Sequence, residues 1–264
     1  MPQTAAPETG VGAQLRAWRQ RRRLSQLDLA LDAGVSPRHV SFVETGRSAP
    51  SRDMVLHLAE RLDVPLRERN GLLLAAGYAP VYGERDLDAP DMEPLRRALD
   101  LILAGHEPYP AIVVDRQWKL LAGTRAVGLL TANVAPELLA PPANVLRIAL
   151  HPDGMAQDII NFGEWREHLL DRLVRQIAHN GDEELTELLQ ELLAYPGPEP
   201  AAGAGPAGEI VVPLRMRTAI GDLSFFSTVA SFGTAVDVTV SELGIESFFP
   251  ADAATADAVR AHAA

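Results

Sequence analysis

The segment from Arg38 to Val43, Arg-His-Val-Ser-Phe-Val, combines hydrogen-bond donors, an aromatic ring and two valines at helical spacing. Val40 and Val43 lie three residues apart, so in a helix they share an apolar side and leave the opposite side facing outward. On that outward side, Arg38 can bind guanine O6 and N7 through two hydrogen bonds, and Phe42 can pack on a thymine methyl. These side chains predict a helix that contacts base edges in a DNA major groove.

Patterns typical of catalysis are missing from the sequence. It has no cysteine, which excludes disulfides, thiolate metal sites and cysteine nucleophiles. The seven histidines lack metal-ligand spacing, and there is no phosphate-binding loop, serine nucleophile elbow or dinucleotide fingerprint. Glu164, Glu167 and His168 would share a helix face, but such carboxylates usually form a solvated acidic surface. We therefore expect no enzyme, no catalytic residue, no bound metal and no cofactor.

The outward-facing residues need a helical framework, and capping residues predict one over about residues 11–78. Serines that can cap helices and glycines that can end them alternate with apolar helical periods. Gly34 permits the tight turn that a helix-turn-helix motif requires. The five expected helices run over about 11–22, from Ser25 to about Ala33, between Ser36 and Gly46, over about 52–62 after Ser51, and from Pro65 to near Ala76.

Charge is divided unevenly along the chain. The total net charge is −11. Residues 1–78 contain 11 arginines and 8 acidic residues, a net charge of +3, whereas the remaining residues have a net charge of −14. A mildly basic domain predicts modest DNA affinity for a monomer, so we expect a homodimer that binds two half-sites on double-stranded DNA. No apolar run is long enough for membrane insertion, and residues 1–10 resemble a loose leader rather than a signal peptide, so a cytoplasmic location is expected.

The segment 79–91 is rich in proline, glycine and aspartate and is expected to connect two domains. Beyond it, helical and strand-like patterns alternate, which predicts an α+β domain over 92–250. An alanine-rich tail, 251–264, follows, and its composition favours a helix. Expected helices cover 92–104, 125–131, 136–139, 161–179 and 182–194. Expected strands cover 111–114, 118–121, 209–218, 223–231 and 236–240, and a loop covers 196–208.

The first domain resembles the Xre family of repressors. The resemblance covers about 60 residues and rests on the runs Leu24–Ala30, Ala33–Arg47, Pro50–Ser51 and Leu58–Pro65. It implies an all-α, five-helix, lambda-repressor-like fold in which Gln26 contacts a phosphate and Glu44 stabilises the local structure. Arg47 is placed for a further backbone contact. The predicted DNA-binding set is Gln26, Ser36, Pro37, Arg38, His39, Ser41, Phe42, Arg47 and Arg52.

Nearly the whole chain resembles the MmyB-like transcription regulators of bacteria. This resemblance rests on Leu66–Pro80, His106–Ala111, Asn144–Arg147, Leu150–Gly154, Asn161–Trp165 and Leu223–Thr228. It implies a PAS-like second domain, a curved antiparallel sheet with helices on one side, that binds a small apolar ligand of the fatty-acid type. The expected wall residues are Trp118, Phe162, Trp165, Phe225, Phe226 and Phe232, and the expected carboxylate partners are Arg147, His151 and Asn161. Because side chains alternate along a strand, at most one of Phe225 and Phe226 can face a given pocket.

Simpler interpretations of the same residues remain open at this point. Phe42 and the wall aromatics can belong to an ordinary core. Arg21–Arg23 can be either a clamp for DNA phosphates or a solvated helix end, where cations interact favourably with the helix dipole. The acidic second domain can also be a dimerisation or protein–protein interaction module that holds no small molecule.

Overall fold

The computed structural model describes residues 10–197 and 211–263. The chain forms two compact units, with residues up to Glu84 making most of the first and residues from Arg85 making most of the second. The expected leader, apart from Gly10, and most of the expected loop 196–208 lie outside the described residues.

Five helices make up the first unit in the part of the chain that is described. They are α1 (Val11–Arg21), α2 (Gln26–Asp32), α3 (Pro37–Glu44), α4 (Arg52–Arg61) and α5 (Leu66–Ala75). Each of the three predicted serine caps accepts a backbone N–H in the first turn of its helix, at 3.1 to 3.3 Å. Gly34 adopts a φ of 63° between α2 and α3, a conformation that glycine reaches without steric cost. The expected five-helix, helix-turn-helix fold is confirmed.

The second unit is built on an antiparallel sheet of five strands in the described residues, in the order β2-β1-β5-β4-β3. The strands are β1 (Ala111–Val114), β2 (Leu120–Gly123), β3 (Leu214–Thr218), β4 (Gly221–Ala230) and β5 (Gly244–Pro250). Its helices are η1 (Pro90–Met92), α6 (Glu93–His106), α7 (Val127–Leu130), α8 (Pro136–Leu139), α9 (Val145–Leu150), η2 (Met155–Gln157), α10 (Phe162–Asn180), α11 (Glu183–Ala194), α12 (Val238–Ser241) and α13 (Ala253–Ala263). Two strands, helices and three further strands follow one another as the α+β, PAS-like expectation requires.

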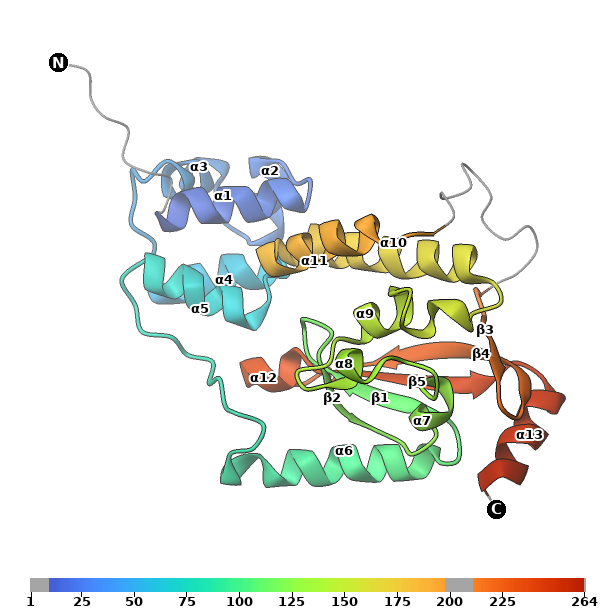
Figure 1. Cartoon of the computed structure of the whole chain (residues 1–264). Helices are drawn as coiled ribbons and strands as arrows, with labels where there is room; N and C mark the ends of the chain where they lie inside the picture. Colours follow the sequence, from blue (N-terminus) through green and yellow to red (C-terminus); the bar gives the residue numbers. More distant parts are fainter. Residues whose placement is uncertain (1–9, 198–210, 264) are drawn as a thin grey trace. The chain divides into compact units, whose positions relative to one another are not determined.

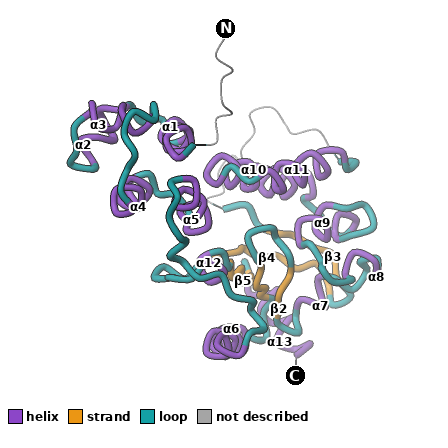
Figure 2. The backbone as a smooth tube through the Cα atoms, turned by 90° about the vertical axis from the view of Figure 1, so that its left-hand side faces the viewer, coloured by secondary structure: helices purple, strands orange, loops and turns teal. Residues whose placement is uncertain are grey.

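Helices cover both faces of this sheet, and not the single face that the resemblance implied (Figures 1 and 2). Every residue of β1 is buried, and its side chains alternate between two apolar clusters. Ala111 and Val113 pack with α6, whereas Ile112 and Val114 pack into a larger core with α9, α10 and α11. This larger core contains the cavity described below.

The third strand of the C-terminal group was predicted in the wrong place. Residues 236–240 form no strand: Val236 is exposed, and one turn of helix, α12, begins at Val238. The strand is instead Gly244–Pro250, which pairs with β1 and β4 in the middle of the sheet. Alternating valines indicate a strand only weakly, because β-propensity depends on the packing context. Here Gly244–Pro250 already fills the place between β1 and β4 in the sheet.

The alanine-rich tail beyond Pro250 is helical, as its composition suggested, but it packs on the second unit. It forms α13, and Val259 of this helix is buried in the same core as the sheet. The backbone N–H of Ser224 on β4 also donates to the Thr255 hydroxyl at 3.0 Å. α13 is therefore part of the second unit rather than an appendage to it.

Candidate DNA-binding surface and ligand cavity

Helix α3 presents an apolar side to the first unit and a polar side outward. Val40 and Val43 are each 1% exposed, whereas Arg38 is exposed. The Arg38 guanidinium carbon lies 5.0 Å from the Phe42 ring centroid, and that of Arg47 lies 5.9 Å from it. The ring, which is half-buried, thus holds two arginines near its face by cation–π attraction.

A buried ion pair fixes this helix to its neighbours. The Arg19 Nε and Nη2 atoms of α1 donate to the two Glu44 carboxylate oxygens at 2.7 and 2.9 Å. Gln26 Nε2, at the start of α2, donates to Glu44 Oε2 at 2.8 Å. The bond to Glu44 raises the pKa of Arg19. Glu44 therefore joins three helices, which agrees with the structural role that the resemblance implies.

The predicted DNA-binding residues lie at the start of α2, along α3 and just beyond it, and at the start of α4. Ser36, Pro37, Arg47 and Arg52 are exposed, and Gln26, His39 and Ser41 are half-buried. Gln26 faces Glu44 in the free protein, so a phosphate contact would use its second amide hydrogen. His39 Nε2 is buried without a hydrogen-bond partner among the described residues. How these residues contact DNA remains a prediction.

A cavity of about 230 Å³ lies in the larger core of the second unit, against one face of the sheet. Two of the predicted wall residues, Trp118 and Trp165, line it. The described lining consists of Ile112, Trp118, Leu120, Val127, Leu130, Thr131, Leu139, Val145, Leu146, Ile148, Ala149, Met155, Trp165, Leu169, Leu214, Glu246 and Phe248. The volume is below the roughly 300–1,000 Å³ of pockets for drug-sized ligands.

The other predicted wall aromatics lie outside this described lining. Phe225 is fully buried in the surrounding core. Phe226 faces the opposite side of the sheet, where its ring stacks on Phe249 at 5.4 Å. Phe232 packs with the α6 cluster, and Phe162 packs at the edge of the larger core. The aromatic wall residue on the sheet is instead Phe248 of β5. The sequence patterns had predicted Phe225 or Phe226 of β4 for this position.

The three predicted carboxylate partners have other contacts and do not appear in the described lining. Arg147 pairs with both oxygens of Glu191 at 2.7 and 2.8 Å. This bond lowers the pKa of Glu191, and burial raises the pKa of Tyr195 beside it to about 12. The Asn161 amide donates to the Pro213 carbonyl at 2.8 Å, and the His151 ring lies edge-on to Tyr195.

Two charged residues at the cavity were missed from sequence. Glu246 of β5 lines the cavity and is 4% exposed. Arg172 Nη1 of α10 donates to both its oxygens, at 3.1 and 3.2 Å, and the Arg172 guanidinium carbon lies 4.4 Å from the Trp118 ring centroid. The available signal was a glutamate in the mainly apolar run Gly-Ile-Glu-Ser-Phe-Phe, where the two polar residues also made the strand hard to recognise.

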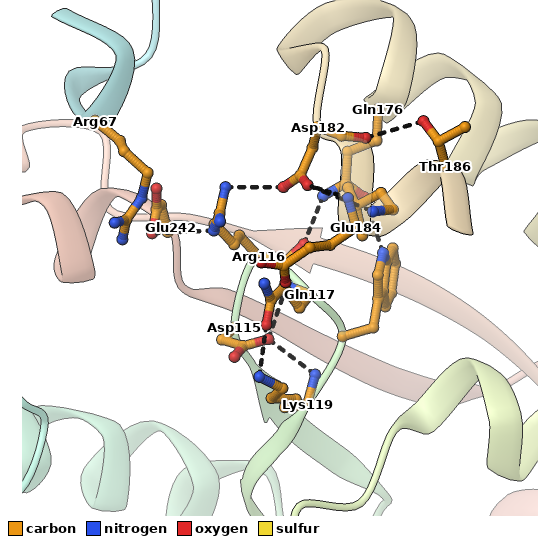
Figure 3. Close-up of polar contacts among 12 residues, drawn as sticks. Arg67, Asp115, Arg116, Gln117, Lys119, Gln176, Asp182, Glu184, Thr186 and Glu242 are labelled. Carbon is orange, nitrogen blue, oxygen red and sulfur yellow. Dashed lines mark hydrogen bonds and ion pairs between the residues drawn. The ribbon is translucent and has the colours of Figure 1, made fainter. Parts of the chain in front are cut away.

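Hydrogen bonds of Arg116 with Gln176 and Asp182 link the β1–β2 turn to α10 and α11 (Figure 3). Trp118 Nε1 donates to Gln176 Oε1, and Gln176 Nε2 donates to the Arg116 carbonyl, both at 2.9 Å. Arg116 Nη1 lies 2.8 Å from Asp182, which caps α11. Trp118 has a φ of 66°, an uncommon conformation for a bulky side chain, and this network maintains it.

A helix-turn-helix unit and an α+β unit with an apolar cavity define a DNA-binding regulator with a ligand-binding domain. Two family models agree with this class. Residues 15–69 match the helix-turn-helix family, and residues 95–261 match the MmyB-like transcription regulator ligand binding domain. The second match covers more than half of the chain, so the protein belongs to the MmyB-like transcription regulators. This is a family of transcription regulators and not of enzymes.

A curated relative matches a quarter of the chain. The chain is 41% identical over 68 residues to the HTH-type transcriptional repressor RghR of Bacillus subtilis (strain 168). The match covers 25% of this chain and 48% of that protein, so the chain spans about half the length of the relative. Within the described residues, no helix combines the length and apolar character needed to cross a membrane, and no cluster of potential metal ligands occurs.

Proposed function

We propose that this protein binds DNA sequence-specifically as a homodimer and that a small apolar ligand in its second domain regulates this binding. The observation that carries the proposal is an apolar cavity in a domain joined to a helix-turn-helix. The proposed domain bounds are 11–78 for DNA binding, 79–91 for the connector, and 92–250 together with α13 for ligand binding. Because the target is chromosomal DNA, the proposed place of action is the cytoplasm.

DNA recognition is assigned to the outward side of α3. Arg38 is exposed beside Phe42, so its guanidinium is available for the two acceptors of a guanine. Arg47 and Arg52 lie just beyond α3 and at the start of α4, where they can contact phosphates. Phosphate contacts set the position of the protein, and base contacts provide specificity.

A fatty acid is the ligand class that the family resemblance suggests, and the apolar walls suit an acyl chain. Trp118, Trp165 and Phe248 provide the aromatic part of the lining. The modest volume favours a medium-length chain over a long one. A ligand changes DNA binding only if its affinity differs between the two states of the protein.

Footprinting on the DNA upstream of the protein's own gene tests regulation of DNA binding. The expected result is protection of a palindromic site whose occupancy changes when bacterial lipid extract is added. Absence of protection both with and without lipid would refute the proposal. An Arg38→Ala variant is the matched control, because it keeps the second domain intact.

The acidic charge of the second domain favours a second candidate function. Residues 79–264 have a net charge of −14, which suits a basic protein partner or a dimerisation surface without any ligand. Mass spectrometry of a solvent extract of the purified protein distinguishes the two. A stoichiometric amphiphile supports the sensor, and a ligand-free protein that is unaffected by lipids supports the interaction module.

A further inference from the structure

The polar part of the cavity is concentrated at one acidic residue. Glu246 is the one ionisable side chain among the described residues that line the cavity, and it is 4% exposed. It lies on the central strand β5, paired opposite Ile112 of β1. Because strand side chains alternate, Glu246 and Phe248 share the cavity face while Ile245 packs on the α6 side.

The contact with Arg172 leaves Glu246 able to accept further hydrogen bonds. A single guanidinium nitrogen, Nη1, bonds to both carboxylate oxygens. A carboxylate offers about four lone-pair sites, and Arg172 uses two of them, so Glu246 keeps acceptor capacity for a ligand in the cavity that it lines. Arg172 itself stacks on Trp118 and is absent from the described lining, so the cavity meets the acidic member of the pair.

The other polar groups of the described lining reinforce this acceptor character. The Thr131 hydroxyl donates its hydrogen to the Val127 carbonyl at 3.1 Å, which leaves its lone pairs as acceptors. The Trp118 indole N–H donates to Gln176 at 2.9 Å, so it is already used. A ligand therefore meets acceptors rather than donors.

We propose that Glu246 selects a ligand whose polar end donates a hydrogen bond, such as the hydroxyl of a fatty alcohol, over the carboxylate of a fatty acid. A hydroxyl satisfies the spare acceptor sites of Glu246. A ligand carboxylate in the same position would place two negative charges together in a region of low dielectric, where repulsion is strong. The inference rests on the proposed apolar ligand site, and it replaces the fatty acid that the family resemblance suggests with a ligand whose head group donates a hydrogen bond.

Calorimetric titration of the full-length protein with decanol and with decanoate at neutral pH tests the inference. Co-purified lipid is first removed by extraction with a cyclodextrin. The two probes have the same chain length and differ in the head group. We expect decanol to bind about tenfold more tightly or better, since a hydrogen bond to a charged acceptor has this order of effect.

A Glu246→Gln variant should reduce this preference, because the charge is lost and the amide can donate to a carboxylate. Glu191→Gln is the matched control, since Glu191 is an acidic residue of the same domain outside the described lining. If Glu246→Gln fails to fold because Arg172 loses its partner, the double variant Arg172→Met, Glu246→Gln removes both charges. Circular dichroism verifies folding.

The outcomes separate the inference from the function on which it rests. Decanoate binding as tightly as decanol in the wild-type protein, or an unchanged preference in a folded variant of Glu246, overturns the head-group assignment and leaves ligand binding intact. If neither probe binds, the proposed ligand-binding function fails and the inference fails with it.

Discussion

Arg38 is the side chain that best separates base recognition from general affinity for DNA. If it binds a guanine, Arg38→Ala should cost about 1–3 kcal/mol at one base pair and relax specificity there. Gel-shift titration on the footprinted site and its single-base variants measures this. Gln26→Ala should instead weaken binding to all sequences. An equal loss from Arg38→Ala on cognate and scrambled DNA would restrict Arg38 to a phosphate contact.

Glu44 makes a different prediction, because its partner Arg19 is buried with it. Glu44→Ala leaves the Arg19 charge without a carboxylate and should lower the free energy of unfolding by about 3–5 kcal/mol. The double variant Arg19→Met, Glu44→Leu removes both charges and should lose much less. Urea unfolding followed by circular dichroism measures both, and similar losses in the two variants would contradict the argument.

His168 links stability to pH. Burial, and then the nearby Arg172, lower its pKa in the folded protein. Below about pH 6.5 the unfolded chain therefore binds more protons than the folded one, and stability falls as the pH falls. His168→Gln should reduce the shift of the urea midpoint between about pH 7.5 and about pH 5.5. Burial also lowers the pKa of His179, so this residue should preserve part of the pH dependence of stability in the His168→Gln variant. If His168→Gln showed the same shift of the urea midpoint as the wild-type protein, the role of His168 would be refuted.

Helices α1 and α3 approach each other closely at Gly12. A Cβ atom there would lie 2.3 Å from the Val43 carbonyl oxygen, so the helices would have to separate. Gly12→Ala should destabilise the protein by about 1–3 kcal/mol or more and disturb the position of α3. Gly71→Ala in α5 is the matched control, because a Cβ there has nothing within 4 Å.

The Gly71→Ala control should stabilise the protein by up to about 1 kcal/mol, since alanine is the better helix former. Thermal unfolding and DNA titration of both variants measure the difference. If Gly12→Ala were as stable as Gly71→Ala, the close packing of α1 on α3 would be excluded as a constraint on the DNA-binding helix.

At the scale of the whole molecule, the division of charge predicts how DNA is bound. The first 78 residues have a net charge of +3 and the rest −14, so a single copy has little electrostatic attraction for DNA. We expect a dimer in sedimentation experiments and two protected half-sites about 34–36 Å apart, or a multiple of this. A monomer that protects one half-site would contradict the prediction.

The DNA-binding unit could be predicted almost completely from local sequence. Ser25, Ser36 and Ser51 cap their helices as expected, and these contacts span three residues. The second unit was predicted less well. The valines at 236–240 suggested a strand, but the central strand is Gly244–Pro250, because strand pairing depends on distant residues and not on local propensity.

The sequence by itself determined the helix-turn-helix, the uneven charge and the resemblance to two protein families. Capping, helical periodicity and composition are local features, so they can be recognised without the folded structure. Only the tertiary structure decided which residues line the cavity. Trp118 and Trp165 are brought to it, whereas Arg147 and Asn161 bond elsewhere. Glu246 reaches the lining because β5 lies between β1 and β4, and Arg172 meets it from a helix 74 residues away in the sequence. Long-range pairing of this kind leaves no local pattern, so the polar end of the cavity became visible only in the folded chain.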